Sequence, residues 1–232
     1  MRVVSRLSVA FLLVLGTLSI SLAQGDADRV IPGGGIFVQG WTGKIDPSSA
    51  AQGRKLEDAK FVQQGNNLHV TTGPAANFWN PANKASGDYT VKATFTESKY
   101  MNLNSHPHSY GVFIGGNDLG TDQQSLVYCA AYGNGTFIIR GFGPAPFQLN
   151  GRMGAANVAV HKAAAVGQPV TQDIAMSVKG GRVDCSINGT VVGSYDKAEI
   201  VAPGKLKSTD GVYGIRFTHN VEAVIAGFGV TK

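Results

Sequence analysis

Apolar and polar residues alternate along most of the chain after about residue 60. The run at 88–97 (DYTVKATFTE) places Tyr89, Val91, Ala93 and Phe95 at every second position. Residues two apart in an extended chain point to the same side, so this pattern predicts a strand with one buried face. Further strand-like runs lie at 67–72, 110–114, 125–132, 136–142, 173–178, 182–187, 190–195, 212–219 and 223–230. The chain is therefore predicted to consist mainly of strands.

Short dipeptides of asparagine and glycine separate several of these runs. They are Asn134-Gly135, Gly180-Gly181 and Asn188-Gly189. A two-residue hairpin turn needs positive φ at both central residues, which Asn and Gly adopt most readily. The dipeptides predict antiparallel hairpins, with 173–195 as a three-stranded meander. Strands do not alternate with helices along the chain, which disfavours a parallel α/β sheet.

Two segments depart from the strand pattern. Residues 46–56 predict one short helical turn, and 155–166 (AANVAVHKAAAV) is an alanine-rich candidate helix. The second segment reads equally as a loop, because Gly154 and Gly167 bracket it. About ten strands in one globular region, 37–232, predict an all-β fold of two antiparallel sheets, a jelly-roll sandwich. A closed barrel is the alternative.

The first residues have the three parts of an export signal. In 1–23, Arg2 and Arg6 precede a short apolar stretch, and small residues lie before Ala23. This pattern predicts a secretory signal peptide cleaved after Ala23, and a secreted or periplasmic mature protein. The glycine-rich segment 24–36 is predicted to be a flexible lead-in. No later apolar stretch is long enough to predict a membrane span.

Composition excludes several classes of protein. With 43% hydrophobic and 15% charged residues, the chain has enough apolar material for a core, so global disorder is excluded. Its 31 glycines show no three-residue period, which excludes collagen. The formal charge of +5 is scattered and forms no basic run, so nucleic acid is not a predicted partner.

The two cysteines, Cys129 and Cys185, allow one disulfide. An exported protein meets an oxidising compartment, where such a bond persists. The sequence leaves open whether the pair is bonded or consists of two buried thiols, because it does not show how close their Cα atoms lie. Two cysteines alone make a poor metal site, so no structural zinc is predicted.

The last strands carry a family resemblance. The sequence DGVYGIRF at 210–217, followed by AGFGV at 226–230, resembles the closing strands of concanavalin A-like (laminin-G-like) jelly rolls. Other segments that resemble this superfamily are 68–70, 87–91, 179–181 and 187–192. The resemblance spans most of 61–230 and is nearest to the exported 3-keto-disaccharide hydrolase-type domains; laminarinase-type glycoside hydrolases are also similar. It implies a jelly roll and a carbohydrate ligand.

The motifs that carry catalysis in those families are absent from this sequence. Laminarinase-type enzymes have a Glu-x-Asp-x-Glu strand, whereas the glutamates here are scattered at Glu57, Glu97, Glu199 and Glu222. The 3-keto-disaccharide hydrolase-type domains have an Asn-Ser-Gly-Ile strand, whereas 109–116 reads SYGVFIGG. Glycosidases need two nearby carboxyl groups. The spacing of Asp118, Asp122, Asp184 and Asp210 selects no pair, so the catalytic residues are unknown.

A histidine pair is the strongest candidate for chemistry. His106 and His108 flank a proline, which favours an extended chain, so both imidazoles are expected on one side, facing a ligand or sharing a metal. Two ligands are too few for a metal site, and His219 supplies a third only if the fold brings it near. The loop 115–122 is rich in the oxygen atoms that calcium prefers, but it lacks a recognised calcium-loop spacing, so an ordinary turn is favoured. No metal site or cofactor is therefore predicted.

An aromatic residue and a tyrosine pair are candidates for sugar contacts. Trp79 lies in a stretch rich in turn formers (NFWNP), where an exposed indole would stack on a sugar ring. The alternative is that this tryptophan plugs the end of the sandwich. Tyr128 and Tyr132 lie four apart on one predicted strand and therefore share a face.

Which face of the 125–132 strand is buried decides the role of these tyrosines. If Val127, Cys129 and Ala131 face the core, the tyrosines line an outer surface that Arg140 and Arg216 can join from other strands. If the tyrosine face is the core, that surface does not exist. The run is apolar on both faces, so its periodicity leaves both alternatives open.

The predicted function is carbohydrate binding without catalysis, with a glycan or small saccharide as partner. The ligand-binding residues predicted for it are Trp79, His106, His108, Tyr128, Tyr132, Arg140, Arg216 and His219. Two alternatives remain. One is a sugar-active hydrolase or lyase of the 3-keto-disaccharide hydrolase type, and the other is an exported structural or protein-binding module.

Overall fold

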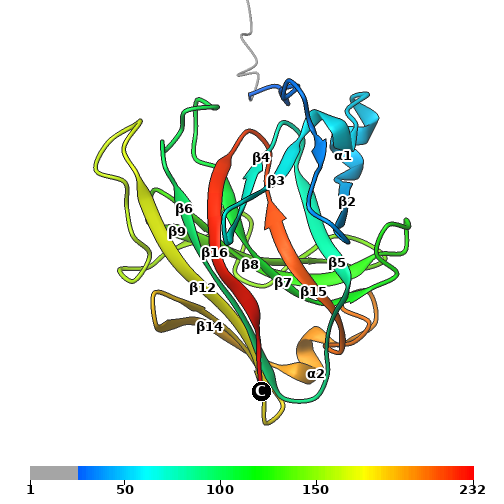
Figure 1. Cartoon of the computed structure of the whole chain (residues 1–232). Helices are drawn as coiled ribbons and strands as arrows, with labels where there is room; N and C mark the ends of the chain where they lie inside the picture. Colours follow the sequence, from blue (N-terminus) through cyan, green and yellow to red (C-terminus); the bar gives the residue numbers. More distant parts are fainter. Residues whose placement is uncertain (1–25) are drawn as a thin grey trace, which may run out of the picture.

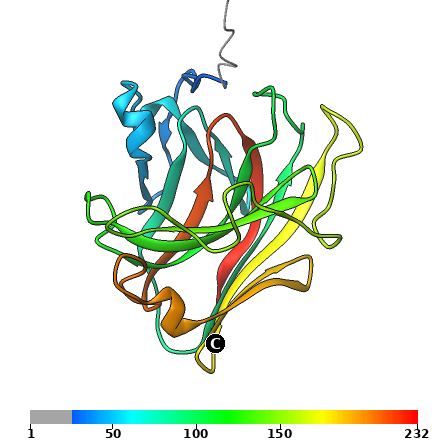
Figure 2. The same cartoon turned by 180° about the vertical axis from the view of Figure 1, so that it is seen from behind.

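The computed structural model describes residues 26–232 and consists of two β-sheets packed face to face (Figures 1 and 2). The predicted two-layer sandwich is confirmed, and the closed barrel is not formed. The predicted signal peptide, 1–23, lies outside the described residues.

In the first sheet the last strand of the chain lies between two strands from its first half. Its eight strands follow the order β1 (Gly35–Ile36), β3 (Lys60–Gln64), β4 (Asn67–Thr71), β16 (Glu222–Thr231), β6 (Tyr89–Glu97), β12 (Val170–Lys179), β13 (Arg182–Ile187) and β14 (Thr190–Asp196). Only β1 and β3 pair in parallel; the other neighbours in this sheet are antiparallel.

The second sheet carries the predicted site residues. Its main path is β10 (Phe147–Gln148), β9 (Thr136–Phe142), β8 (Ser125–Tyr132), β7 (Ser109–Asn117), β15 (Gly211–Phe217), β5 (Ala76–Ala85) and β2 (Thr42–Ile45). Strand β11 (Ala155–Ala156) pairs with β9 beside this path. All of these pairs are antiparallel, as the hairpin signals predicted.

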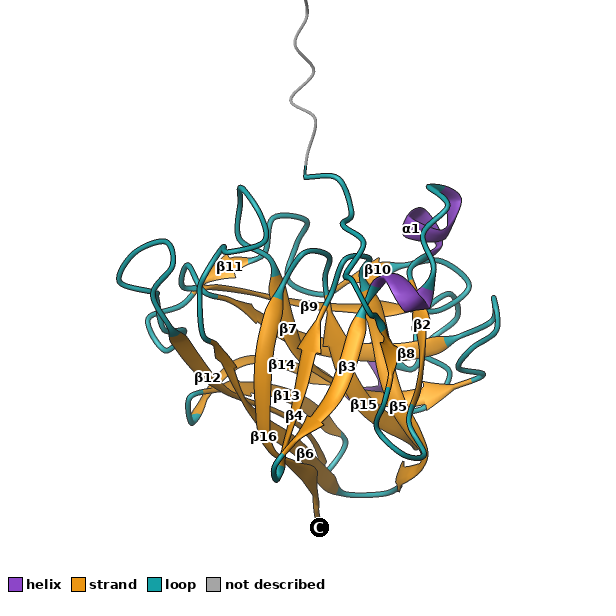
Figure 3. Cartoon of the chain, turned by 45° about the horizontal axis from the view of Figure 1, so that its top comes forward, coloured by secondary structure: helices purple, strands orange, loops and turns teal. Residues whose placement is uncertain are grey.

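Helices are short and lie outside the two sheets (Figure 3). They are α1 (Pro47–Ala51), the 3₁₀ turn η1 (Leu56–Asp58) and α2 (Lys197–Ile200). Helix α1 confirms the helical turn predicted in 46–56. The candidate helix at 155–166 is instead strand β11 followed by a loop. Its first residues are extended because Ala155 pairs with Phe137 of β9. No helix within 26–232 has the length and apolarity needed to cross a bilayer.

Backbone conformation confirms two of the three predicted tight turns. Gly180 and Gly181 have φ of 54° and 82°, and Asn188 and Gly189 have φ of 49° and 80°. These turns join β12, β13 and β14 into the predicted meander. The hairpin between β8 and β9 is also formed, but its loop is longer than two residues because the last ladder pair is Ala131 with Phe137.

Both faces of β8 are buried, and this explains why its periodicity was ambiguous. Val127, Cys129 and Ala131 belong to the main core between the sheets, together with large side chains such as Phe95. A second apolar cluster covers the opposite face of the sheet; its buried members are Trp79, Phe113, Leu126, Tyr128, Ala130 and Ile138. The structure therefore places Tyr128 and Tyr132 on the outer face, which is the first of the two alternatives.

A disulfide joins the two layers of the sandwich. Cys129 in β8 and Cys185 in β13 are bonded, with their Cα atoms 5.9 Å apart. Both residues are buried, and they belong to different sheets. The disulfide that the sequence left open is thus present, and it ties the sheets together through the core.

The segment predicted as a flexible lead-in packs against the domain from Asp26 onward. The side-chain oxygen of Asn220 accepts a hydrogen bond from the Arg29 amide at 3.0 Å, and its side-chain nitrogen donates to the Ala27 carbonyl at 2.9 Å. Asp28 is only 8% exposed. The glycine-rich sequence gave no sign of these contacts, because they depend on Asn220, which lies far away in the chain.

One buried carboxyl group has an unusual environment in the first sheet. Glu97 ends β6 and is 3% exposed. One carboxyl oxygen accepts a hydrogen bond from the Met101 amide at 3.0 Å, and the other has no partner among the described residues. Burial raises the pKa of Glu97 to about 7, although the Met101 amide opposes this shift.

Glu97→Gln is expected to stabilise the protein at pH 8 and to leave it almost unchanged at pH 4, below the ordinary pKa of the carboxyl group. The raised pKa means that the folded state holds a proton that the unfolded state releases near pH 4.5, so stability falls as pH rises to about 7. The gain at pH 8 should reach about 3 kcal/mol, since each pKa unit corresponds to about 1.4 kcal/mol. Urea unfolding at both pH values measures it, with exposed Glu57→Gln as control. An equal gain at both pH values would contradict the prediction.

Candidate functional site

A cavity of about 740 Å³ opens on the outer face of the second sheet. Tyr128 from β8, Arg140 and Phe142 from β9, and Arg216 from β15 line it. The register explains this grouping, because Tyr128 pairs directly with Arg140, and Phe142 lies two residues further on the same face. The remaining walls come from α1 and its flanks and from 26–28, 146–148 and 218–219.

The buried guanidinium of Arg216 is neutralised by Asp46, the residue that precedes α1. Arg216 is 3% exposed, and its two terminal nitrogens donate to the two carboxylate oxygens of Asp46 at 2.5 Å and 2.6 Å. Its guanidinium carbon lies 5.3 Å from the ring centre of Tyr128 and 5.4 Å from that of Phe142. Bidentate pairing and aromatic packing are the contacts that arginine makes best. This group therefore forms a rigid floor for the cavity.

Arg216 stays protonated and Tyr128 stays neutral at physiological pH. Burial by itself lowers the pKa of Arg216, but the Asp46 carboxylate more than offsets this and holds it above its ordinary value. Burial also raises the pKa of Tyr128, which remains a neutral phenol at physiological pH. The lining also includes the half-buried Arg140 and the exposed Gln148 and Gln52.

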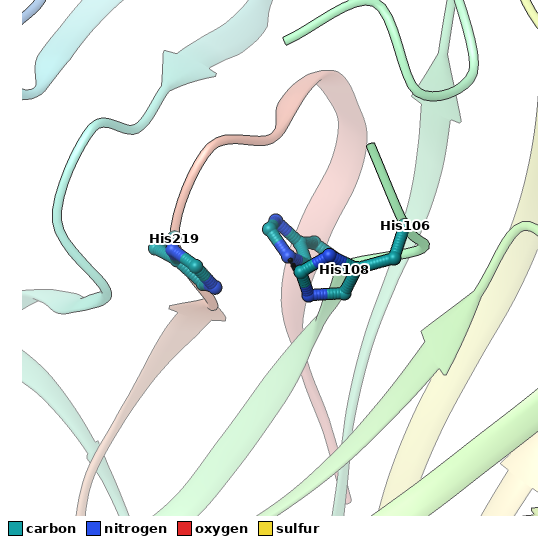
Figure 4. Close-up of side chains that lie close together, drawn as sticks. All are labelled: His106, His108 and His219. Atoms are coloured by element: carbon teal, nitrogen blue, oxygen red, sulfur yellow. Dashed lines mark hydrogen bonds between the residues drawn. The ribbon is translucent and has the colours of Figure 1, made fainter. Parts of the chain in front are cut away.

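Three histidines meet where β7 begins and β15 ends (Figure 4). His106 and His108 lie just before β7, and His219 lies just after β15. Strands β7 and β15 are antiparallel, and Tyr110 pairs with Phe217. Two residues before Tyr110 and two after Phe217, the same register places His108 opposite His219.

Distances within this histidine cluster are short. The ring centres of His108 and His219 are 3.9 Å apart, with the ring planes inclined by 27°. The Nε2 atoms of His106 and His108 are 2.8 Å apart. Each of the three residues offers a nitrogen within 4.8 Å of the other two. Within residues 26–232, these are the three metal-ligating side chains that share one site.

Two aspartates from the amino-terminal segment stand behind the histidines. Asp28 Oδ1 lies 2.9 Å from His219 Nδ1, and Asp26 Oδ2 lies 3.6 Å from His106 Nδ1. Each carboxylate also accepts a hydroxyl hydrogen bond, Asp28 from Ser49 at 2.5 Å and Asp26 from Ser105 at 2.6 Å. Hydrogen bonds from Ser105 lower the pKa of Asp26.

Burial lowers the pKa of two of these imidazoles. His108 falls to about 4, with the charges of His219 and His106 adding to the effect of burial. Burial also lowers the pKa of His219, although the Asp28 carboxylate opposes this shift. At neutral pH His108 is therefore an uncharged imidazole, the form in which a ring nitrogen has a free lone pair.

The structure brings most of the predicted site residues together, in two adjoining groups. Tyr128, Arg140, Arg216 and His219 line the cavity, and His219 also belongs to the histidine cluster with His106 and His108. Tyr132 shares the outer face with Tyr128 but is not among the residues that line this cavity.

Trp79 does not lie in a loop, contrary to the prediction. It is part of the ten-residue strand β5, where it pairs with Thr42 and Gly214. It is 5% exposed, and half-buried Leu119 packs in the same outer cluster. Its turn-rich flanks misled the prediction, because the partner strands supply the ladder that overrides local propensity.

The segment 115–122 begins within β7, and both of its carboxylates lie beside lysines. Asp118 contacts Lys207 at 2.7 Å, and Asp122 contacts Lys44 at 3.2 Å. The other two aspartates considered for catalysis are also engaged, Asp184 with the Ser194 hydroxyl and Asp210 with the Gly87 amide. Each of these four aspartates is therefore engaged by another residue.

Sequence reasoning missed several residues of the site. Asp26 and Asp28 fell in the segment predicted as a flexible lead-in, and Asp46 precedes Pro47 at the start of a helical turn, where aspartate is common. Nothing local marks these three carboxylates as site residues. Phe142 did carry a signal, since it lies two positions after Arg140 on the same predicted strand.

Comparisons with known proteins identify the fold. Neither a protein-family model nor a curated protein matches the sequence. The carbohydrate-binding module CBM66 from Bacillus subtilis superposes with a TM-score of 0.54 at 9% identity, covering 86% of this chain and 99% of that one. A Bacillus subtilis protein of unknown function with a galectin-like fold superposes with a TM-score of 0.55 at 16% identity, covering 82% and 88%. At such identities the likeness shows the fold alone, a jelly-roll β-sandwich.

Proposed function

We propose that this chain binds a saccharide, without catalysis, in the cavity over β8, β9 and β15. One observation carries the proposal: an open cavity of about 740 Å³ combines the aromatic ring of Phe142 with the hydrogen-bonding side chains of Arg140 and Gln148. Saccharide rings have an apolar face that stacks on aromatic rings and a rim of hydroxyl groups that needs donors and acceptors. The CBM66 likeness is consistent with this proposal.

The contacts of the cavity carboxylates support binding rather than hydrolysis. Asp46 is held by both terminal nitrogens of Arg216, and Asp28 by the Ser49 hydroxyl beside His219. Asp26 has a lowered pKa, which disfavours the role of a general acid. A glycosidase needs one protonated carboxyl group near one free carboxylate, and the cavity offers neither in that form.

The same proposal places the protein outside the cytoplasm. The disulfide between Cys129 and Cys185 supports an oxidising compartment, which agrees with the export signal read from the sequence. A bond buried between two sheets forms before or during their packing, so the chain is proposed to fold after export.

Calorimetry with neutral, acidic and amino oligosaccharides tests the proposal. Arg140→Ala and Gln148→Ala should each weaken the binding of whichever saccharide in the panel binds most tightly to the wild type. For Arg140 the loss should be about tenfold or more, because a hydrogen bond to a charged group contributes about 1.5–3 kcal/mol. Arg182→Ala is the matched control, because Arg182 lies on β13 of the opposite sheet and pairs with Asp196.

Three outcomes would count against the proposal. They are no binding across the whole panel, unchanged affinity in Arg140→Ala, or an equal loss in Arg182→Ala. Mass spectrometry of the incubated oligosaccharides separates binding from turnover. Release of shortened sugars would favour the hydrolase or lyase alternative.

A further inference from the structure

We propose that His106, His108 and His219 together bind one divalent transition-metal ion of the Zn²⁺ class. This site is distinct from the saccharide proposal, because it depends on imidazole nitrogens and needs no sugar. The histidine cluster is brought together by the fold: two members precede β7 and the third follows β15.

The spacing of the nitrogens fits such an ion. Zinc–nitrogen bonds of about 2.0–2.1 Å in a tetrahedron place neighbouring nitrogens about 3.3 Å apart. The His106 and His108 Nε2 atoms are 2.8 Å apart, and a ligand nitrogen from all three residues lies within 4.8 Å of the others. These values lie on either side of the ideal one, so small side-chain rotations bring three nitrogens to bonding distance.

A carboxylate lies behind the ring of His219 and another behind the ring of His106. Asp28 lies beside Nδ1 of His219 and Asp26 beside Nδ1 of His106, so a metal would bind the Nε2 atoms. It would replace the contact that Nε2 of His106 makes with Nε2 of His108. A carboxylate on the far ring nitrogen sets the tautomer and makes the ligating nitrogen more basic. The hydroxyl groups of Ser49 and Ser105 in turn hold the two carboxylates in place.

The site is reachable and has a suitable local charge. The side chain of His106 is 48% exposed, and that of His219 is 27% exposed and lines the cavity. Two aspartates beside the cluster offset part of the charge of a divalent ion. Nitrogen ligands favour zinc, copper and nickel over calcium and magnesium. Three protein ligands leave a fourth position for water, and an ion held here would lie at the edge of the cavity.

Titration of the chelator-treated full chain with Zn²⁺ alone tests the proposal by calorimetry. We expect one ion per chain, and at least tenfold weaker binding in His106→Ala and in His219→Ala. His161→Ala is the matched control; His161 is exposed, its ring nitrogen contacts the Thr171 carbonyl at 2.8 Å, and its removal should leave affinity unchanged. Co²⁺ added in place of Zn²⁺ should give the intense visible absorption of a tetrahedral nitrogen-ligated site.

His106→Ala is the decisive variant, because its exposed side chain can be removed with little risk to folding. Unfolding temperature without metal should match that of wild type, and only the wild type should show a rise when Zn²⁺ is added. Equal Zn²⁺ affinity in wild type and His106→Ala, or an equal loss in His161→Ala, would overturn the proposal. No saccharide is present in these measurements, so they stand or fall independently of sugar binding.

Discussion

Asp46→Asn is expected to lower the free energy of unfolding by about 3–5 kcal/mol, because it leaves a buried guanidinium without its counter-charge. Arg216 is 3% exposed, and the Asp46 side chain that neutralises it is 15% exposed. The asparagine side chain has a single acceptor oxygen and no charge, so the bidentate pairing with Arg216 is lost. Chemical denaturation at neutral pH measures the loss.

Two further variants give this prediction its controls. In Asp46→Asn/Arg216→Met both charges are removed, so most of the stability should return, since no buried charge is left without a partner. Asp122→Asn removes a carboxylate whose side chain is 99% exposed beside Lys44, and it should change stability by less than about 1 kcal/mol. A loss in Asp46→Asn no larger than that in Asp122→Asn would show that the Arg216 charge is not truly desolvated.

Removal of the disulfide by Cys129→Ala/Cys185→Ala is expected to lower the free energy of unfolding by about 4 kcal/mol. The two half-cystines are 56 residues apart in sequence, and an open loop of that length gives the unfolded chain much more freedom. The loop-closure relation for this length corresponds to about 4 kcal/mol at 25 °C. Both side chains are buried between the sheets, so lost packing adds to the effect.

Urea unfolding of the oxidised and reduced wild type, beside the double alanine variant, checks this second prediction. Reduced wild type and the variant should unfold at similar and lower urea concentrations than the oxidised chain. The variant should keep the far-ultraviolet spectrum of a β protein under native conditions. If the oxidised and reduced proteins unfolded at the same urea concentration, the disulfide would not restrain the unfolded ensemble.

Local patterns along the chain determined the elements and their general arrangement. Alternation in 88–97 became β6, and the predicted meander at 173–195 became β12 to β14 with positive φ at both of its turns. These features depend on residues close in sequence, so they can be read without knowing the fold. The failure at Trp79 shows the limit of that approach, because a partner strand can override turn-forming neighbours.

The sequence could not predict which face of β8 points to the core between the sheets, and the reason is a different one. Both sides of this strand are buried: Leu126 and Tyr128 on one side, Val127 and Cys129 on the other. The apolar pattern therefore does not distinguish the inner face from the outer face. The second apolar cluster buries the outer face of this strand as fully as the main core buries the inner face. The outward position of Tyr128, and with it the floor of the cavity, is therefore a property of the packed structure.

By itself the sequence determined the strand content, the sandwich and the tight turns of the meander, because side-chain alternation and glycine φ preferences act over a few residues. Only the tertiary structure decided the site. Asp46 meets Arg216 across 170 residues of chain, and His219 joins His106 and His108 through the register of β7 with β15. Such meetings depend on which strands become neighbours and at what register, and that is a property of the whole packed chain.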